Sequence, residues 1–217
     1  MSMDVDALRT VQRAPLRTVR PQDLDGVLTH SRRTIGRLVE AGALVRIAKG
    51  VYTAPPDGRD GRAWKPTLED AALAIGTARF GNRRVVLMGL GAARHWAAIP
   101  RAIGVTTIAV PEAGRPPVEV DGGGKVHMIP RDLDRLDAVL ERTELGPALV
   151  TTPAQTIYDL TMKSAQGGMP AEADAAVRHL LAQVTRTELA EVVEARGRAN
   201  DALRTTLAEM GSQDERS

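Results

Sequence analysis

A helical pattern that runs directly into a tight hairpin signal is the feature that most constrains the fold of this chain. Apolar residues recur every three or four positions between residues 31 and 41, and Gly42 follows where the pattern stops. Strand-like segments at 44–48 and 51–53 then flank Lys49-Gly50, a dipeptide suited to a tight turn. A helix and a β-hairpin are therefore expected in immediate succession.

Two shorter helices are expected before this unit. The first covers about residues 4–13 with Asp4 as its cap, and the second begins at Pro21, a favoured first helical position. The apolar residues expected to face inward from the second helix are Leu24, Val27 and Leu28. Three helices followed by a β-hairpin within about 50 residues predict a winged helix-turn-helix over residues 1–54.

The helix over 31–41 carries the residue pattern that favours DNA binding, with Ser31 as its expected N-cap. On a helical wheel Arg33 and Arg37 fall opposite the apolar face, and Arg32 lies on a flank. Arginines in the first turn oppose the helix macrodipole, so they suit a helix whose N-terminus meets phosphate or guanine. The full set of expected DNA contacts is Ser31, Arg32, Arg33, Arg37, Arg46, Lys49 and Tyr52. A solvated basic face used for protein contacts is the alternative, with Tyr52 packed in the core.

The charge distribution supports a division of the chain. Residues 1–65 hold 12 Lys and Arg against 7 Asp and Glu, whereas the remainder holds 17 against 20. A basic unit joined to a mildly acidic one suggests that only the first meets a polyanion. The chain has no cysteine, which excludes disulfides and thiolate zinc sites, and its few aromatics argue against a platform for single-stranded nucleic acid.

Beyond the basic unit the pattern mixes helices and strands. Residues 55–66 are expected to form a Pro- and Gly-rich linker, residues 67–210 a mixed α/β domain that ends in helices, and residues 211–217 a frayed tail. The apolar spacing at 133–140 predicts a helix, and Thr152-Pro153 predicts the start of another, with Gln155 completing a capping box. The expected fold class is α+β.

Three segments of the chain resemble the AbiEi-type antitoxin family. Residues 42–52 resemble the family's G-x-L-x-R-x-x-x-G-V-Y wing, and residues 86–93 resemble the segment that follows its linker. Residues 150–160 are similar to its VTxPxRTxxDL signature, although Gln155 stands where Arg is common. The likeness keeps the family's order and spacing over residues 15–195.

This resemblance implies an antitoxin of a two-gene system. Its winged helix would bind double-stranded operator DNA, with a homodimer as one option, and repress its own operon. The second domain would counter a nucleotidyltransferase-like toxin. No cofactor and no metal are implied.

Two other functions stay open. An antitoxin could act as an enzyme that phosphorylates its toxin, and Asp132, Asp134 and Asp137 would then be the metal-ligand candidates at a helix start. A solvated, capped helix start explains the same residues. A transcription regulator whose second domain senses a small ligand fits the architecture equally well.

The histidines show no metal-ligand spacing, and the glycine pairs near residues 89 and 122 do not complete a nucleotide-binding motif. No apolar run is long enough to cross a membrane, and the N-terminus lacks the apolar core of a secretory signal. The expected location is the cytoplasm, with no membrane partner.

Overall fold

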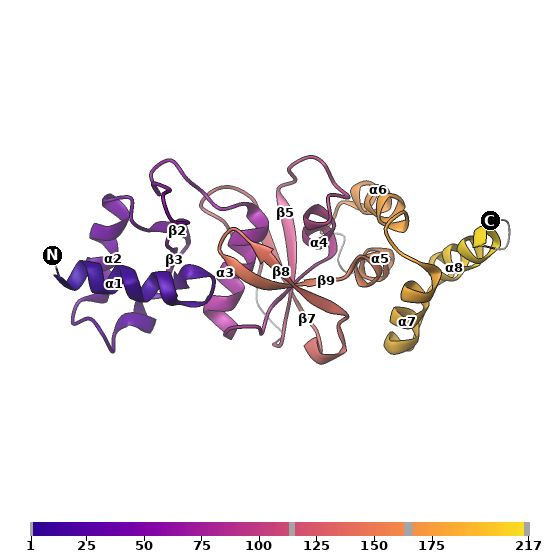
Figure 1. The fold of residues 1–217 in the computed structure, drawn as a ribbon, viewed down its shortest axis with the longest axis horizontal. Coiled ribbons are helices and arrows are strands. Elements are labelled where there is room, and N and C mark those ends of the chain that lie inside the picture. Colours follow the sequence, from indigo (N-terminus) through magenta and orange to yellow (C-terminus); the bar gives the residue numbers. More distant parts are fainter. Residues whose placement is uncertain (1, 113–115, 163–166, 215–217) are drawn as a thin grey trace.

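The computed structural model describes residues 2–112, 116–162 and 167–214. The molecule is elongated, with the N-terminal helices at one end, a sheet in the middle and the C-terminal helices at the other end (Figure 1). The fold is α+β, as the sequence predicts. In chain order the elements are α1 (Ser2–Arg13), η1 (Pro15–Arg17), β1 (Thr18–Val19), η2 (Pro21–Leu24), α2 (Ser31–Glu40), β2 (Val45–Ala48), β3 (Val51–Thr53), α3 (Leu68–Phe80), β4 (Val86–Met88), α4 (Gly89–His95), β5 (Val105–Val110), β6 (Val118–Glu119), β7 (Lys125–Pro130), η3 (Leu133–Arg135), β8 (Ala138–Thr143), β9 (Gly146–Thr151), α5 (Pro153–Thr161), α6 (Pro170–Leu181), α7 (Arg186–Arg196) and α8 (Asp201–Asp214).

The N-terminal unit, residues 2–54, packs α1 and α2 around one side of a small sheet. Its strands are antiparallel in the order β1-β3-β2. Its core consists of Ala7, Val11, Val19, Leu24, Leu28, Ile35, Leu38, Leu44 and Ala54. Ile35 and Leu38 enter this core from α2 at the predicted helical spacing, which leaves the opposite side of α2 exposed.

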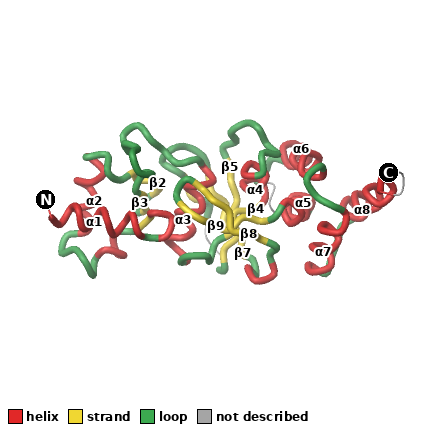
Figure 2. Tube along the Cα trace, viewed as in Figure 1, coloured by secondary structure: helices red, strands yellow, loops and turns green. Residues whose placement is uncertain are grey.

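A larger mixed sheet forms the middle of the molecule, with the strand order β6-β7-β5-β4-β9-β8. Strand β4 runs parallel to β9 and antiparallel to β5, and β5 runs parallel to β7. Helices α3 and α4 contact β5 and cover it. Several side chains of the central strands are therefore fully buried. Along the chain, α3, β4, α4 and β5 alternate, and β6 to β9 then follow with only the 3-10 turn η3 among them. The strands gather at the centre of the molecule with helices on either side (Figure 2).

The β2–β3 hairpin shares a hydrophobic core with α3 and the central sheet. The hairpin residues in that core are Ile47, Ala48 and Val51. Trp64, within the segment 55–66, is buried in the same core, and its indole Nε1 donates to Glu144 Oε2 at 3.3 Å. Packing against α3 therefore holds the tip of the hairpin.

The C-terminal helices form a separate core. Helices α5, α6, α7 and α8 gather around Ile157, Leu160, Leu180 and Leu189, which are all fully buried. Gly197 ends α7 with a left-handed φ of 70°. The tail expected from residue 211 is helical as far as Asp214, and residues 215–217 lie outside the described part of the chain.

The helix predicted at 133–140 is wrong. Only the 3-10 turn η3 forms there, and the chain then becomes strand β8, paired with β9 from Ala138↔Thr151 to Thr143↔Gly146. Val139 and Leu140 are exposed on this edge strand. Pairing with β9 overrides the local spacing that favours a helix.

Two details of the N-terminal unit also differ from expectation. The helix expected from Pro21 is a single 3-10 turn, and Val27 is 59% exposed rather than turned inward, although Leu24 and Leu28 are buried. Helix α2 has His30 at its N-cap position, so Ser31 is its first helical residue and not its cap. Among the described residues, no helix combines the length and apolar character needed to cross a membrane.

Candidate nucleic-acid interface

The exposed face of α2 carries the arginines that the sequence singles out. Arg32 and Arg33 are exposed in the first turn, and Arg37 lies one turn later. Within the part of the chain that the structure describes, the guanidinium groups of Arg32 and Arg33 make no hydrogen bond and no ion pair. Two unneutralised guanidinium groups therefore stand at the helix end that favours negative charge.

Ser31 lies under this face rather than on it. Its side chain is buried, and its hydroxyl donates to Asp25 Oδ1 at 2.5 Å. Asp25 sits in the turn before α2, so this bond fixes the turn against the start of the helix. Ser31 thus positions α2, and its hydroxyl is already used.

Arg37 is shared with another helix. Its Nη2 lies 2.6 Å from Asp4 Oδ1 on α1, and the two side chains are about half and one third exposed. The bond to Arg37 holds the pKa of Asp4 below its usual value. Arg37 therefore reaches the exposed face of α2 already paired with a carboxylate.

The hairpin residues lie on an element that also packs against α3. Arg46 donates to Asp121 Oδ2 at 2.5 Å, and the backbone N–H of Asp121 donates to the Ile47 carbonyl at 2.9 Å. These bonds tie β2 to the turn between β6 and β7. Lys49 is exposed at the turn, and Tyr52 is half-buried against the N-terminal core.

Three features of this surface are not predicted from the sequence. Gly36 lies on the exposed face between the arginines, and a Cβ added there would meet nothing within 4 Å. Glycine in a helix interior costs about 1 kcal/mol relative to alanine, so its place here suits close approach by another molecule. The other two are the carboxylates of Asp4 and Asp25, whose partners lie on a different element and cannot be read from local spacing.

The aspartates considered as metal ligands do not assemble. Asp132 and Asp134 are exposed around η3, whereas the Asp137 carboxylate accepts from the Thr152 hydroxyl at 2.6 Å. Across residues 2–112, 116–162 and 167–214, no group of three histidines or carboxylates is placed to hold a metal ion. Asp137 serves the start of α5.

The Thr152 cap of α5 is confirmed, because its hydroxyl accepts from the Gln155 backbone N–H. The predicted capping box is wrong. The Gln155 side chain instead donates to Asp159 Oδ1 at 3.0 Å, and its own oxygen accepts from the Asp137 backbone N–H at 3.4 Å.

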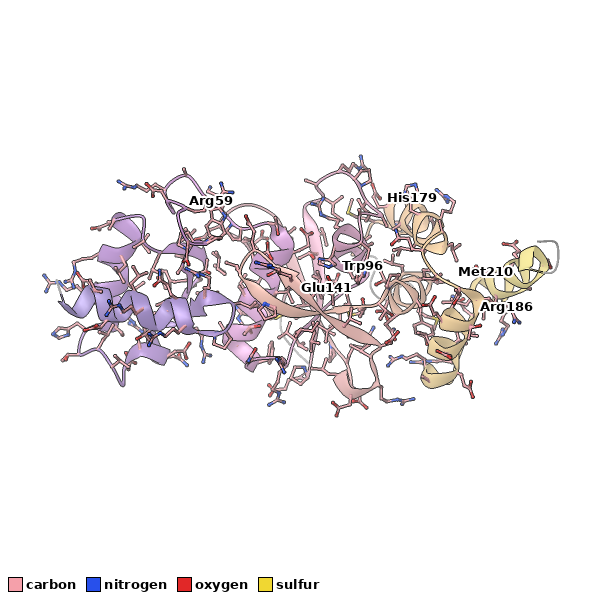
Figure 3. The ribbon with its side chains drawn as sticks, viewed as in Figure 1. Arg59, Trp96, Glu141, His179, Arg186 and Met210 are labelled. Carbon is pink, nitrogen blue, oxygen red and sulfur yellow. The ribbon has the colours of Figure 1, made fainter. Side chains whose placement is uncertain are left out.

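A polar cluster lies in the middle of the molecule, where Trp96 and Glu141 are found (Figure 3). His95 Nε2 is 3.3 Å from Glu141 Oε2, and Trp96 donates to the Thr151 carbonyl at 2.8 Å. Nearby, Glu69 of α3 pairs with Arg94 of α4 at 3.0 Å, and burial raises the pKa of Glu69. These contacts join α3, α4, β8 and β9, so we assign them a structural role.

Comparison with known proteins gives a fold likeness. No protein-family model matches the sequence, and no curated protein matches it. The crystal structure of the RV2827C protein from Mycobacterium tuberculosis matches with a TM-score of 0.60 and 19% identity, over 97% of this chain and 76% of that one. An antigenic nucleotidyltransferase-like protein from Paracoccidioides brasiliensis matches with a TM-score of 0.37 and 10% identity, over 57% of this chain and 84% of that one, which is too low to indicate a common fold. The chain thus has the fold of the RV2827C protein along nearly its whole length.

Proposed function

We propose that the N-terminal unit is a winged helix-turn-helix that binds double-stranded DNA, with α2 as the recognition helix. The order of its elements supports this: a helix and a short strand, a turn of helix, α2, and then a hairpin. The strand order β1-β3-β2 places the first strand beside the second strand of the hairpin. In helix-turn-helix proteins the second helix of the motif lies in the major groove.

The observation that carries the proposal is the exposed face of α2. Arg32 and Arg33 point away from the core, without partners in the described chain, on either side of the open position at Gly36. A helix used only for packing would gain stability from acidic residues in its first turn. Guanidinium groups in that place match phosphate oxygens and the O6 and N7 atoms of guanine.

The family resemblance suggests what the DNA binding is for. We propose an antitoxin that represses its own operon, whose cognate toxin is a nucleotidyltransferase-like enzyme, with the region after residue 66 acting against the toxin. The three motifs at 42–52, 86–93 and 150–160 support this assignment by their order. A cytoplasmic location belongs to the same proposal.

The test uses the full chain and the DNA upstream of its own gene. Fluorescence anisotropy should show binding to that duplex that is tighter than binding to a shuffled duplex of equal length. The affinity should fall steeply with salt, because each phosphate contact releases a counterion. Equal affinity for both duplexes, or no dependence on salt, would refute operator binding.

The antitoxin role has a separate readout. Cells that express the adjacent toxin gene should recover growth when this chain is co-expressed. The mass of the purified toxin should stay unchanged if neutralisation is not covalent, whereas a gain of one phosphate would favour the kinase alternative. Continued arrest of growth would refute the antitoxin role and leave DNA binding intact.

A further inference from the structure

A cavity of about 420 Å³ opens beside α5, between the loop after β7 and the end of α7. We call it the α5 cavity. Its charged and titratable lining consists of Arg131, Asp132, Tyr158, Asp159, Arg196 and Arg198. Small-molecule sites range over roughly 300–1,000 Å³, so this cavity has the size of a small ligand.

Reciprocal hydrogen bonds hold two walls of the cavity together. Arg135 donates from η3 to the Ala195 carbonyl at 2.9 Å, and Arg196 donates from α7 back to the Arg135 carbonyl at 3.4 Å. The Tyr158 hydroxyl donates to the Arg198 carbonyl at 3.2 Å, and the Arg196 guanidinium lies 5.8 Å from the centre of the Tyr158 ring. The cavity is therefore bounded by tied elements rather than by a loose loop.

Asp159 forms the floor of the cavity and is 2% exposed. Its Oδ1 accepts from Gln155, whereas its Oδ2 has no hydrogen-bond partner among the described residues. Burial outweighs Arg131 and Arg196 and raises the pKa of this carboxyl to about 7. An unpaired buried carboxyl oxygen costs free energy, and a ligand that bonded to it would remove that cost.

The surrounding charges favour an anionic ligand. Arg131 from the loop and Arg196 from α7 act on the charge of Asp159. Arg198 and Asp132, both exposed residues, also line the cavity. Arg131 is half-buried, and this burial lowers its pKa. Three guanidinium groups disfavour a metal ion here and suit an oxyanion with several acceptors.

We propose that the α5 cavity binds the phosphate group of a small soluble ligand, with Arg131, Arg196 and Arg198 facing its oxygens and the protonated Asp159 donating its O–H to one of them. A carboxylic acid can donate such a bond, whereas a carboxylate would repel the anion. Binding is therefore coupled to the proton on Asp159. Titration of this group with a pKa of about 7 predicts an affinity that falls about tenfold between pH 6 and pH 8.

Sulfate is the first probe, because it is an oxyanion that does not titrate in this range. The carboxyl carbon of Asp159 in the full-length protein should be followed by NMR across pH, at constant ionic strength, with sodium chloride or sodium sulfate. Sulfate should raise the pKa of Asp159, and its affinity by calorimetry should fall from pH 6 to pH 8. An unchanged or lowered pKa would overturn the proposal.

Variants separate the cavity from general anion binding. Arg198→Ala should weaken sulfate about tenfold, since one charge-assisted contact is lost while the Arg198 carbonyl remains. The matched control is Arg178→Ala on the exposed face of α6, which should leave sulfate affinity unchanged. Asp159→Asn should abolish the pH dependence, because its amide donates at every pH. Equal loss in both arginine variants, or a pH dependence retained in Asp159→Asn, would refute the site.

The ligand class is tested with adenosine monophosphate, adenosine and a short DNA duplex. Adenosine monophosphate should displace sulfate and adenosine should not, because the phosphate is the recognised group. Displacement by the duplex alone would assign the cavity to nucleic acid and overturn the small-ligand proposal.

Discussion

Arg37 and Asp4 join the exposed face of α2 to α1, with 2.6 Å between the Arg37 Nη2 and the Asp4 Oδ1. The two residues are 33 positions apart in the sequence. The pair places a carboxylate beside the surface proposed to meet DNA. It therefore occupies one of the guanidinium groups that a phosphate would otherwise contact.

Asp4→Asn should strengthen DNA binding. The change frees Arg37 and removes a negative charge that repels phosphate, so the affinity should rise, and most at low salt. Anisotropy titrations at two salt concentrations measure this. Asp6→Asn on the same helix makes an equal change in net charge beside Arg9 and serves as the control. An equal gain in both variants would show a general charge effect and not release of Arg37.

Arg33→Ala should weaken operator binding by about 1–3 kcal/mol if its guanidinium reads a base, or lower the salt slope by about one if it meets a phosphate. The matched control is Arg59→Ala, an exposed arginine on the loop after β3 (Figure 3). Thermal unfolding should be unchanged in both variants, because neither guanidinium has a partner among the described residues. If Arg33→Ala bound the operator as tightly as the wild type, α2 would not be the recognition helix.

Substitutions at Gly36 should separate stability from DNA binding. Gly36→Ala places its methyl group in open space and should stabilise the fold by about 1 kcal/mol through helix propensity. Gly36→Gln should stabilise it comparably but weaken DNA binding, because the longer side chain occupies the space that DNA enters. Gly26→Gln, also in open space but before α2, is the control. Full DNA affinity of Gly36→Gln would place the contact surface elsewhere.

Periodicity and capping predicted the elements that depend on neighbours in the sequence. Helix α2, the β2–β3 hairpin and the Thr152 cap of α5 all follow from such signals. Strand β8 did not, because its apolar spacing suits a helix and only β9 selects the extended form.

The candidate interface shows the same limit. A helical wheel places Arg33 and Arg37 opposite the apolar face and Arg32 on a flank, and all three residues are exposed in the structure. A helical wheel cannot show which residues of other elements lie opposite that face. Arg37 meets Asp4 and Arg46 meets Asp121, 75 positions away, so both pairings depend on how whole units pack. The α5 cavity likewise combines residues from three separate segments.

Asp159→Asn should stabilise the protein at neutral and alkaline pH. The folded-state pKa of about 7 lies above the ordinary aspartate value, so the folded protein binds the proton more tightly. The contribution of Asp159 to the free energy of unfolding is therefore greatest below about pH 4. It falls as the pH rises toward 7 and stays constant at higher pH. The total loss is on the order of 4 kcal/mol.

Denaturant unfolding of wild type and variant at pH 5 and pH 8 tests this. The variant should gain more over wild type at pH 8 than at pH 5. Asp132→Asn removes an exposed carboxylate at the edge of the same cavity and should change neither. An equal effect of Asp159→Asn at both pH values would show that Asp159 is ionised throughout.

Arg46 and Asp121 distinguish a structural tether from a DNA contact. Asp121 neutralises Arg46, and the hairpin tip is packed against α3, so Arg46→Ala should leave operator affinity nearly unchanged. Asp121→Asn should leave operator affinity unchanged as well. Both variants should lower the melting temperature to a similar small extent, because either one breaks the same exposed ion pair. The double variant should then be no less stable than the single ones, which a double-mutant cycle measures. If Arg46 instead turns to a phosphate on binding, Asp121→Asn would raise the affinity for DNA and Arg46→Ala would lower it. That pair of opposite changes would return the hairpin to the DNA interface.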